Sequence, residues 1–239
     1  MECTEEYIKI KKNNCWFVTR NNFIYGLIKK HTIRDDIKIL DAGCAQGNLL
    51  LYLRNKGFKN ICGIDSNKEL LKQLSDSDIE THTMDLIKTD FDDETFDVIV
   101  SSDIIEHIDD DMKAIHEMKR ILKKDGIIII FVPAFMSLWS YHDVINGHKR
   151  RYTLKELESK ILGSGLTIQK ASYWNFFMFF PNFLVRKTKS MIGFKKSDFY
   201  SFPELINLII IYIIHFENFL LKYIDLPFGV SAFVVAKKI

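Results

Sequence analysis

The segment IKILDAGCAQGNLL, residues 37–50, decides the fold. It opens with a mostly apolar run, Ile37–Leu40, which is typical of a buried strand, and it ends where leucines begin to recur at helical spacing. Between them lies a loop with glycines at positions 43 and 47, which let the backbone turn sharply and let a ligand approach the amides. A dinucleotide-binding loop would carry further glycines where Ala45 and Asn48 stand, so that fingerprint is excluded.

The alternation of strand and helix continues as far as Val132. Short apolar or β-branched runs predict four more strands, at Asn60–Ile64, Glu80–Thr83, Phe96–Ser101 and Ile127–Val132. The segments between them carry apolar residues at helical spacing. This alternation predicts an α/β fold, with a parallel sheet and helices on both of its faces.

Composition sets the broad class. The 239 residues, of which 47% are hydrophobic, suffice for one large α/β domain. Lys and Arg exceed Asp and Glu by 33 − 31 = 2, so the chain has no basic field for non-specific nucleic-acid binding. The four cysteines lack zinc-type spacing, and the start MECTEEYIKIKK lacks the apolar region of a signal peptide. We therefore expect reduced thiols and a cytoplasmic or membrane-peripheral location.

The apolar segment Leu205–Ile224 is nearly long enough to span a bilayer. At helical spacing its polar residues fall on one stripe: Asn207, His215, Asn218 and Lys222, with Glu217 beside it. One interpretation is an amphipathic helix packed on the core with its polar stripe outward. A second is a hydrophobic lid or a membrane-surface foot, because basic residues lie just upstream, at Arg186, Lys187, Lys189, Lys195 and Lys196. A transmembrane helix is the third.

Acidic residues follow the predicted strands. Asp41 comes after the first strand, Asp65 after the second and Asp85 after the third. A carboxylate there can accept hydrogen bonds from both hydroxyls of a ribose, and open α/β sheets bind ligands at this edge. Each acid could instead cap the helix that follows it. The pair Glu106-His107, after the fourth strand, could likewise be only the start of a helix.

These motifs, in this order, resemble the class I S-adenosylmethionine-dependent methyltransferases, in a type 11/23-like group. The pattern of that group is D-x-G-C-G-x-G, then an acid after the second strand, then F-D-x-V followed by E-H, and the match covers residues 37–132. Residues 15–20, CWFVTR, resemble the W-F-x-x-R helix that precedes the domain in one subgroup, and residues 147–153, GHKRRYT, resemble its G-H-x-R-R-Y-T loop. One departure is Ala45, which replaces the middle glycine of the family loop.

The resemblance implies a Rossmann-like, mostly parallel seven-stranded sheet with a helical insertion before the last strand. It implies S-adenosyl-L-methionine as the cofactor and S-adenosyl-L-homocysteine as the product. Asp41 and the loop glycines would surround the methionine end, Asp65 would hold the ribose, and Asp85 would lie near the adenine. The full set of cofactor-binding residues that it implies is Trp16, Arg20, Asp41, Gly43, Gly47, Asp65, Ser66, Asp85, Leu86, Ser102 and His107.

The chain is expected to form a single domain, residues 1–239, in five parts. They are an N-terminal helical cap (1–36), the cofactor-binding core (37–132), an acceptor-side loop with the sixth strand (133–173), the apolar helical insertion (174–226) and the last strand (227–239).

The loop between the fifth and sixth strands is the predicted acceptor side. His142 and His148 are candidate general bases, since a histidine can take a proton from an attacking hydroxyl or amine. The candidate substrate-binding residues are Tyr141, Arg150, Arg151 and Tyr152. The alternative is a surface loop whose arginines pair with Glu156 and Glu158. The sequence shows no cluster with metal-ligand spacing, so no metal site is predicted.

The predicted function is methyl transfer to an O or N atom of a small molecule or a glycan- or lipid-linked intermediate. Peripheral membrane contact through residues 184–224 is part of this expectation. Two alternatives stay open: a non-catalytic cofactor-binding partner subunit, and a nucleic-acid methyltransferase. The second is disfavoured because Ser101-Ser102-Asp103-Ile104 lacks the D/N-P-P-aromatic motif for a flipped amino base, so no nucleic-acid partner is expected.

Overall fold

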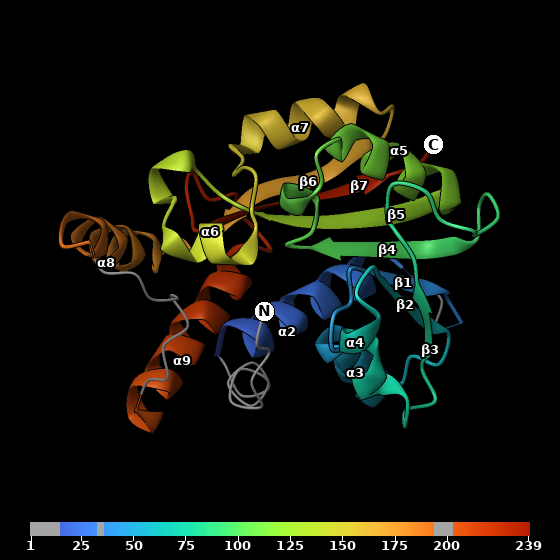
Figure 1. The fold of residues 1–239 in the computed structure, drawn as a ribbon, viewed down its shortest axis with the longest axis horizontal. Helices are drawn as coiled ribbons and strands as arrows, with labels where there is room; N and C mark the ends of the chain where they lie inside the picture. Colours follow the sequence, from blue (N-terminus) through green and yellow to red (C-terminus); the bar gives the residue numbers. More distant parts are fainter. Residues whose placement is uncertain (1–14, 33–35, 194–202) are drawn as a thin grey trace.

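A computed structural model describes residues 15–32, 36–193 and 203–239. Its centre is a seven-stranded sheet in the order β3-β2-β1-β4-β5-β7-β6 (Figure 1). Strands β1 to β5 are parallel, and β7 is antiparallel to both of its neighbours. The strands are β1 (Ile39–Ala42), β2 (Ile61–Asp65), β3 (Glu80–Thr83), β4 (Phe96–Ser102), β5 (Leu122–Pro133), β6 (Thr167–Trp174) and β7 (Ser231–Lys237). The predicted fold class is confirmed.

Helices cover both faces of the sheet (Figure 1). One face carries α5 (Asp111–Ile121) and α7 (Leu154–Gly163), and the other carries α2 (Cys15–His31), α3 (Asn48–Asn55), α4 (Lys68–Leu71) and α9 (Glu204–Leu220). The remaining helices are α6 (Tyr141–Asn146) and α8 (Phe179–Met191), with 3-10 turns at Lys72–Leu74, Ile105–His107 and Met136–Leu138. The segments 1–14, with the start MECTEEYIKIKK, and 194–202, with Lys195 and Lys196, lie outside the described residues.

Strand β5 separates the two layers of the core. Alternate residues point to opposite faces of a strand, so Ile129 packs in one buried cluster and Ile130 in the other. Both side chains are fully buried, as expected for a central strand of a parallel region. Strand β1 ends later than the sequence predicts, so Asp41 lies within the strand and is itself buried.

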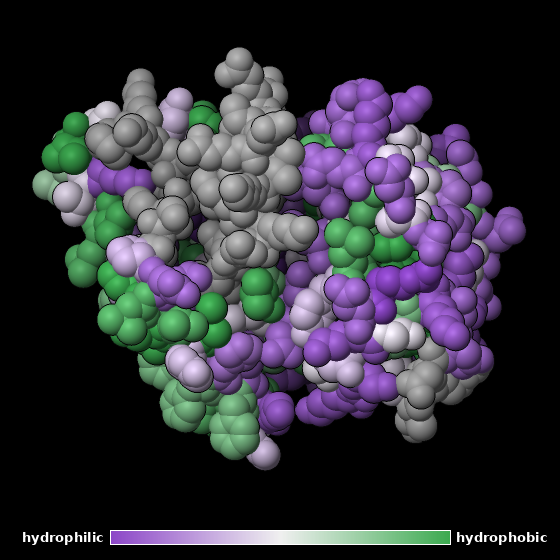
Figure 2. Space-filling view, turned by 90° about the horizontal axis from the view of Figure 1, so that it is seen from below, coloured by the Kyte–Doolittle hydropathy of each residue, from purple (hydrophilic) through white to green (hydrophobic). Residues whose placement is uncertain are grey.

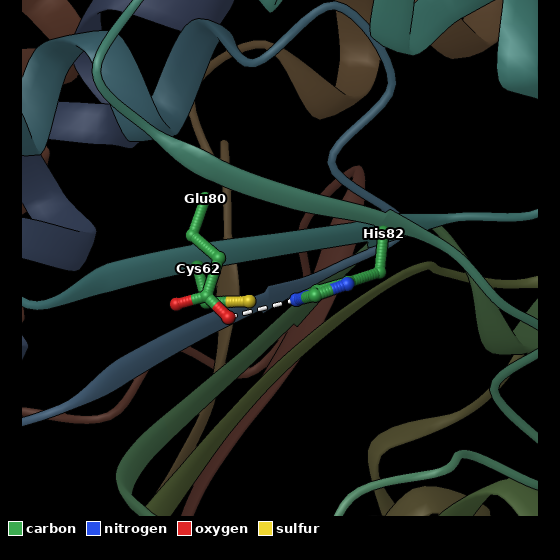
Figure 3. A group of neighbouring side chains, drawn as sticks. All are labelled: Cys62, Glu80 and His82. Carbon is green, nitrogen blue, oxygen red and sulfur yellow. Dashed lines mark hydrogen bonds and ion pairs between the residues drawn. The ribbon is translucent and has the colours of Figure 1, made fainter.

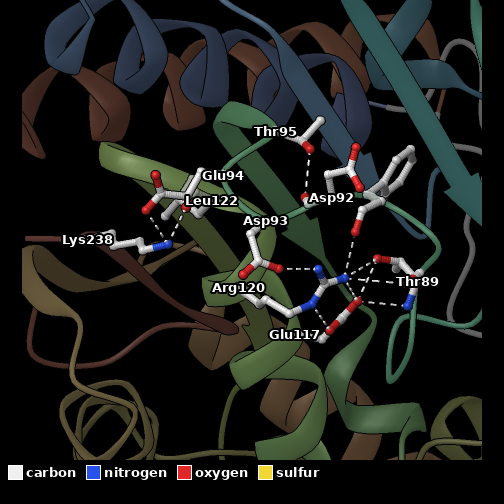
Figure 4. Close-up of polar contacts among 10 residues, drawn as sticks. Thr89, Asp92, Asp93, Glu94, Thr95, Glu117, Arg120, Leu122 and Lys238 are labelled. Atoms are coloured by element: carbon white, nitrogen blue, oxygen red, sulfur yellow. Dashed lines mark hydrogen bonds and ion pairs between the residues drawn. The ribbon is translucent and has the colours of Figure 1, made fainter.

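A polar network holds the chain between β3 and β4 against α5 (Figure 4). The Arg120 guanidinium donates to both carboxylate oxygens of Glu117, at 2.9 and 2.7 Å, and to Asp93 at 2.6 Å. Glu117 also accepts hydrogen bonds from the backbone and hydroxyl of Thr89. These bonds, led by those from Arg120, lower the pKa of Glu117 to about 2. The network anchors the loop that carries Asp85.

The orientation of α9 corrects the expectation of an outward polar stripe. Glu217 and Asn218 are buried, whereas the exposed large side chains of the helix are apolar: Leu205, Ile206, Leu208, Ile209, Tyr212, Phe216 and Phe219. Asn218 accepts a hydrogen bond from the Trp174 indole at 2.8 Å, and Glu217 accepts from the backbone of Asn175. Burial raises the pKa of Glu217 to about 7. The buried amide and carboxylate therefore satisfy polar groups at the end of β6.

The transmembrane interpretation finds no support in the described part of the chain. Within residues 15–32, 36–193 and 203–239, no helix has the length and apolarity that crossing a bilayer requires.

Candidate active site

A cavity of about 1350 Å³ opens at the carboxyl ends of β1, β2 and β4. Side chains from α2 close one side of it, and residues of α6, α8 and α9 contribute to its other walls. The predicted residues that line it are Trp16, Arg20, Asp41, Gly43, Asp65, Ser66, Asp85, Leu86, Ser102, His107, His142, His148 and Arg151. The fold thus brings both the predicted cofactor side and part of the predicted acceptor side to one space. Contact of each residue with a ligand stays a prediction.

Asp65 is held rigidly at the end of β2. Its Oδ2 accepts a hydrogen bond from the Ala45 amide at 2.9 Å, and its Oδ1 accepts one from the Asn67 amide at 2.8 Å. A carboxylate has about four lone-pair sites, so each oxygen keeps capacity for one more donor. Two oxygens fixed in this way at a cavity wall suit a vicinal diol. Ala45 adopts a φ of 48°, a left-handed conformation, at the place where the family loop has glycine.

Asp41 places a buried carboxyl group in the lining of the cavity. Burial, and then the nearby charge of Asp65, raise the pKa of Asp41 to about 7, while Arg20 opposes the shift. A cationic ligand would stabilise the ionised carboxylate. Ser102, at the end of β4, also faces the cavity, and its hydroxyl has no hydrogen-bond partner among the described residues. These groups fit a ligand that combines hydroxyls, hydrogen-bonding atoms and positive charge.

An ion pair joins α2 to the end of β4. Arg20 is 4% exposed and donates to Asp103, which lies just past Ser102. The guanidinium lies 5.5 Å from the centre of the Phe17 ring, a cation–π distance. Arg20 therefore fastens the helix over the sheet edge. Arg20 is predicted from the sequence to contact the cofactor, and the structure also gives it this closing role.

Four predicted residues are not among those that line the cavity: Gly47, Tyr141, Arg150 and Tyr152. Their contact with a ligand stays a prediction. Gly47 precedes α3 with a φ of 75°, and a Cβ there would stand 2.5 Å from the Leu74 side chain, so it serves chain packing. The Tyr152 hydroxyl is buried and donates to Asp111 at 2.8 Å. Arg150 pairs with the same carboxylate at 3.1 Å, and Tyr141 lies on the surface.

The alternative pairing of the arginines with Glu156 and Glu158 is wrong. Glu156 closes a capping box with Thr153 at the start of α7. Arg151 instead donates to Asp143 through Nε at 2.8 Å and Nη2 at 3.1 Å, and both side chains are buried.

The two candidate bases have different partners. His148 Nδ1 lies 2.9 Å from the Asp143 carboxylate, while His142 Nε2 lies 3.1 Å from the Asn146 amide nitrogen. The His148 ring also packs edge-on against His107, with centroids 4.7 Å apart. Cys44 lines the cavity too, but burial and neighbouring carboxylates raise the pKa of its thiol, which argues against a nucleophilic role.

Among the residues that the structure describes, two groups of side chains have atoms spaced as metal ligands, and neither was predicted from the sequence. Glu106, His107 and His148 bring one ligand atom each to within 4.8 Å of one another. The second group joins Cys62 of β2 to Glu80 and His82 of β3 (Figure 3). Sequence spacing could not reveal either group, because the members come from segments that only the folded chain brings together.

Residues of α8 and α9 were also missed. Met178, just before α8, and Pro181, Asn182, Val185 and Arg186 within it line the cavity, as do Ile210 and Ile214 of α9. The only signal in the sequence was the apolar character of 174–226, which the lid interpretation used.

A parallel sheet with this strand order, an antiparallel seventh strand and acids at the ends of β1 and β2 defines the class I methyltransferase fold. Residues 40–130 match the family model described as "Methyltransferase domain". This similarity covers residues 40–130 and points to a methyltransferase domain of the class I fold, and S-adenosyl-L-methionine is the cofactor named for several of the similar solved structures.

Individual relatives agree with this assignment. The ubiquinone biosynthesis O-methyltransferase of Actinobacillus pleuropneumoniae is 33% identical over 134 residues, which cover 50% of this chain and 54% of that protein. A SAM-dependent methyltransferase of Archaeoglobus fulgidus superposes with a TM-score of 0.58 at 17% identity, covering 98% of this chain and all of that one. Phosphoethanolamine N-methyltransferase 2 of Haemonchus contortus, solved with S-adenosyl-L-methionine, gives 0.58 at 16% identity, covering 91% and 52%. The chain spans about half the length of the curated relatives it matches.

Proposed function

We propose that this protein transfers the methyl group of S-adenosyl-L-methionine to an O or N atom of a small molecule or a glycan- or lipid-linked acceptor, and releases S-adenosyl-L-homocysteine. The observation that carries the proposal is that Asp65 and Asp41 line one cavity. The two oxygens of Asp65 are fixed by backbone amides and can accept hydrogen bonds from a diol, and the carboxylate of Asp41 suits a cationic group. The cavity of about 1350 Å³ is larger than the roughly 300–1,000 Å³ of most ligand pockets, so it has room for donor and acceptor together.

Methyl transfer from a sulfonium is an in-line displacement with a neutral thioether as leaving group. The protein therefore has mainly to align the acceptor atom, the methyl carbon and the sulfur. An oxygen acceptor must also lose a proton, and His142 or His148 is the proposed base. His148 is the better positioned of the two, because Asp143 fixes the orientation of its ring.

The direct test incubates the purified chain with methyl-labelled cofactor and with metabolite and lipid extracts, and then identifies the labelled product. Transfer of label by the wild type, with slower transfer by Asp65→Ala at limiting cofactor, supports the proposal. Binding of S-adenosyl-L-homocysteine by calorimetry without labelled product, from any extract or with any added partner chain, would favour the non-catalytic subunit instead. If no heat develops with either form of the cofactor, the assignment of the cavity is wrong.

Asp41 predicts a pH dependence for cofactor binding. Its pKa in the free protein is raised to about 7, and a bound cation lowers the pKa, so the ionised form binds the cofactor more tightly. Affinity should therefore rise roughly tenfold between about pH 6 and pH 8 and then level off. Calorimetry between about pH 6 and pH 8, with a chelator present, measures this change in affinity. Asp41→Asn should abolish the dependence, and an affinity that is flat or falls with pH in the wild type contradicts the role of Asp41.

The acceptor proposal extends to a membrane surface. Besides those of α9, exposed apolar side chains lie on α8 at Phe180, Leu184 and Met191, and Figure 2 shows hydrophobic surface gathered on the left side of the molecule, where Figure 1 places both helices. Lys187 and Lys189 lie on the same helix, where they can meet anionic headgroups. An apolar surface of this kind beside the cavity suits an acceptor delivered from a lipid surface.

Co-sedimentation with anionic vesicles tests this contact. The wild type should sediment with them at low salt, and Leu208→Glu/Tyr212→Glu should not, because it places charge on the exposed face of α9. Leu162→Glu is the matched control, since Leu162 is 57% exposed but lies on α7, across the sheet from α9 (Figure 1). Equal sedimentation of all three proteins, or none by the wild type, would exclude this surface as the membrane contact.

A further inference from the structure

The cluster of Glu106, His107 and His148 lies at the wall of the cavity, which its two histidines line. The first two residues form the 3-10 turn after β4, and His148 follows α6. Both histidines line the cavity, as does Ser102 at the end of β4. Two ligands that each lie about 2.1 Å from one ion are at most about 4.2 Å apart. Because the three ligand atoms already lie within 4.8 Å of one another, small side-chain movements would complete a site.

Glu106 has no partner that explains its burial. The residue is fully buried, and neither carboxylate oxygen accepts a hydrogen bond from any described residue. A carboxyl group taken out of water without hydrogen bonds is costly, and buried carboxylates are ordinarily paired or bound to a metal. The unpaired carboxyl group of Glu106 is an observation separate from the spacing of the three ligand atoms, and it points to a bound ligand.

A hydrogen-bonding group lies next to the ring of each histidine. His148 Nδ1 lies 2.9 Å from the buried Asp143, which Arg151 and the Ser140 amide hold in turn, so Nε2 is left for a ligand. The ring of His107 hydrogen-bonds the backbone of Gly147 and Asn146. A carboxylate or backbone group behind each imidazole is the arrangement that orients metal-binding histidines and fixes their tautomer.

The second cluster is a weaker candidate. His82 and Glu80 already pair with each other at 2.8 Å (Figure 3). The polar groups of this cluster thus have partners without an ion.

We propose that Glu106, His107 and His148 bind one divalent first-row transition metal ion, with zinc as the reference ion, and that its open positions take the oxygen of the acceptor. Two histidines and one carboxylate form a set that binds such ions and leaves positions for a substrate. This inference rests on the proposed methyl transfer and narrows the acceptor to one with a hydroxyl group that can bind a metal.

The acceptor hydroxyl would bind the ion and give its proton to solvent, because a Lewis acid lowers the pKa of a bound oxygen. In this arrangement His148 is a ligand of the ion and is not the general base. A lone pair of that oxygen forms the new O–CH₃ bond while the S–CH₃ bond breaks. The electron pair of the broken bond stays on sulfur, so the sulfonium becomes the neutral thioether. No oxidant or reductant is needed.

The test is a metal titration of the full chain, made metal-free with a chelator and followed by calorimetry and by the visible absorption of Co²⁺. We expect one Co²⁺ per chain, displaced by Zn²⁺. Glu106→Gln and His148→Asn should each weaken Co²⁺ binding by about 100-fold or more, given that even groups behind the ligands contribute about 10–100-fold. His82→Asn is the matched control, because it removes a histidine from the other cluster, and it should leave the affinity unchanged.

Circular dichroism checks that each variant is folded, and His107→Asn replaces either variant that is not. Absence of Co²⁺ binding by the folded wild type overturns the inference, as does binding that His82→Asn abolishes and His148→Asn retains. Binding of S-adenosyl-L-homocysteine by the metal-free chain is measured separately. If that binding holds and no metal binds, the proposed function stands without the ion; if metal binds and the cofactor does not, the methyltransferase proposal itself fails.

Discussion

Asp143→Ala is expected to lower the free energy of unfolding by about 3–5 kcal/mol, the usual cost of breaking a buried ion pair. Asp143 is fully buried and accepts hydrogen bonds from the Arg151 guanidinium and from the Ser140 amide. Its carboxylate also lies 2.9 Å from Nδ1 of His148. Arg151 is 6% exposed, and it also donates to the carbonyl of Ala134 at 3.0 Å. Loss of the carboxylate would leave the buried guanidinium without its counter-charge.

Urea unfolding of the metal-free protein measures this effect. Asp109→Ala is the matched control, because Asp109 forms an ion pair with Lys149 in the same region but its side chain is 88% exposed. Exposed pairs contribute about 0–1 kcal/mol, so the control should unfold close to the wild-type midpoint. Equal losses in the two variants would show that burial of the Asp143–Arg151 pair does not govern the stability of this loop.

Asp65→Ala is expected to weaken binding of S-adenosyl-L-methionine by about 1–3 kcal/mol, or roughly 5- to 150-fold. The physical reason is the loss of charge-assisted hydrogen bonds from the ribose hydroxyls to two oxygens that the amides of Ala45 and Asn67 hold in place. Asp65→Asn should show an intermediate loss, since the amide keeps one acceptor and no charge.

Calorimetry with S-adenosyl-L-homocysteine avoids turnover during this measurement. Asp78→Ala serves as control, because the Asp78 side chain is 94% exposed and lies outside the cavity. A folded Asp65→Ala protein with wild-type affinity would remove the ribose assignment, and with it the strongest argument for the position of the cofactor.

Local patterns were enough to predict the binding edge of the sheet. Strand ends can be located from apolar runs and the glycines that follow them, and parallel strands place their carboxyl ends at one edge. For this reason Asp41, Asp65, Asp85 and Ser102, which lie far apart in the sequence, were expected near one another and line one cavity.

The helix α9 shows where such reasoning fails. Periodicity indicated that Asn218 belongs to a polar stripe, but it does not say which side of a helix is buried. The side of a helix that faces the core depends on the polar groups of the neighbouring segments. Here the indole N–H of Trp174 and the backbone N–H of Asn175 require hydrogen-bond acceptors. The buried side is therefore the one that satisfies these donors, and apolar side chains face outward.

By itself, the sequence determined the α/β class, the order of the strands along the chain and the acids that edge the cavity, because these depend on neighbours a few residues away. Only the tertiary structure decided that Arg20 closes onto Asp103, that Arg151 is neutralised by Asp143, and that Glu106 and His107 meet His148. The physical reason is that a charged side chain pairs with the opposite charge that lies nearest to it in the folded chain. Packing brings together segments that are far apart in the sequence, and the sequence alone does not show which segments will meet.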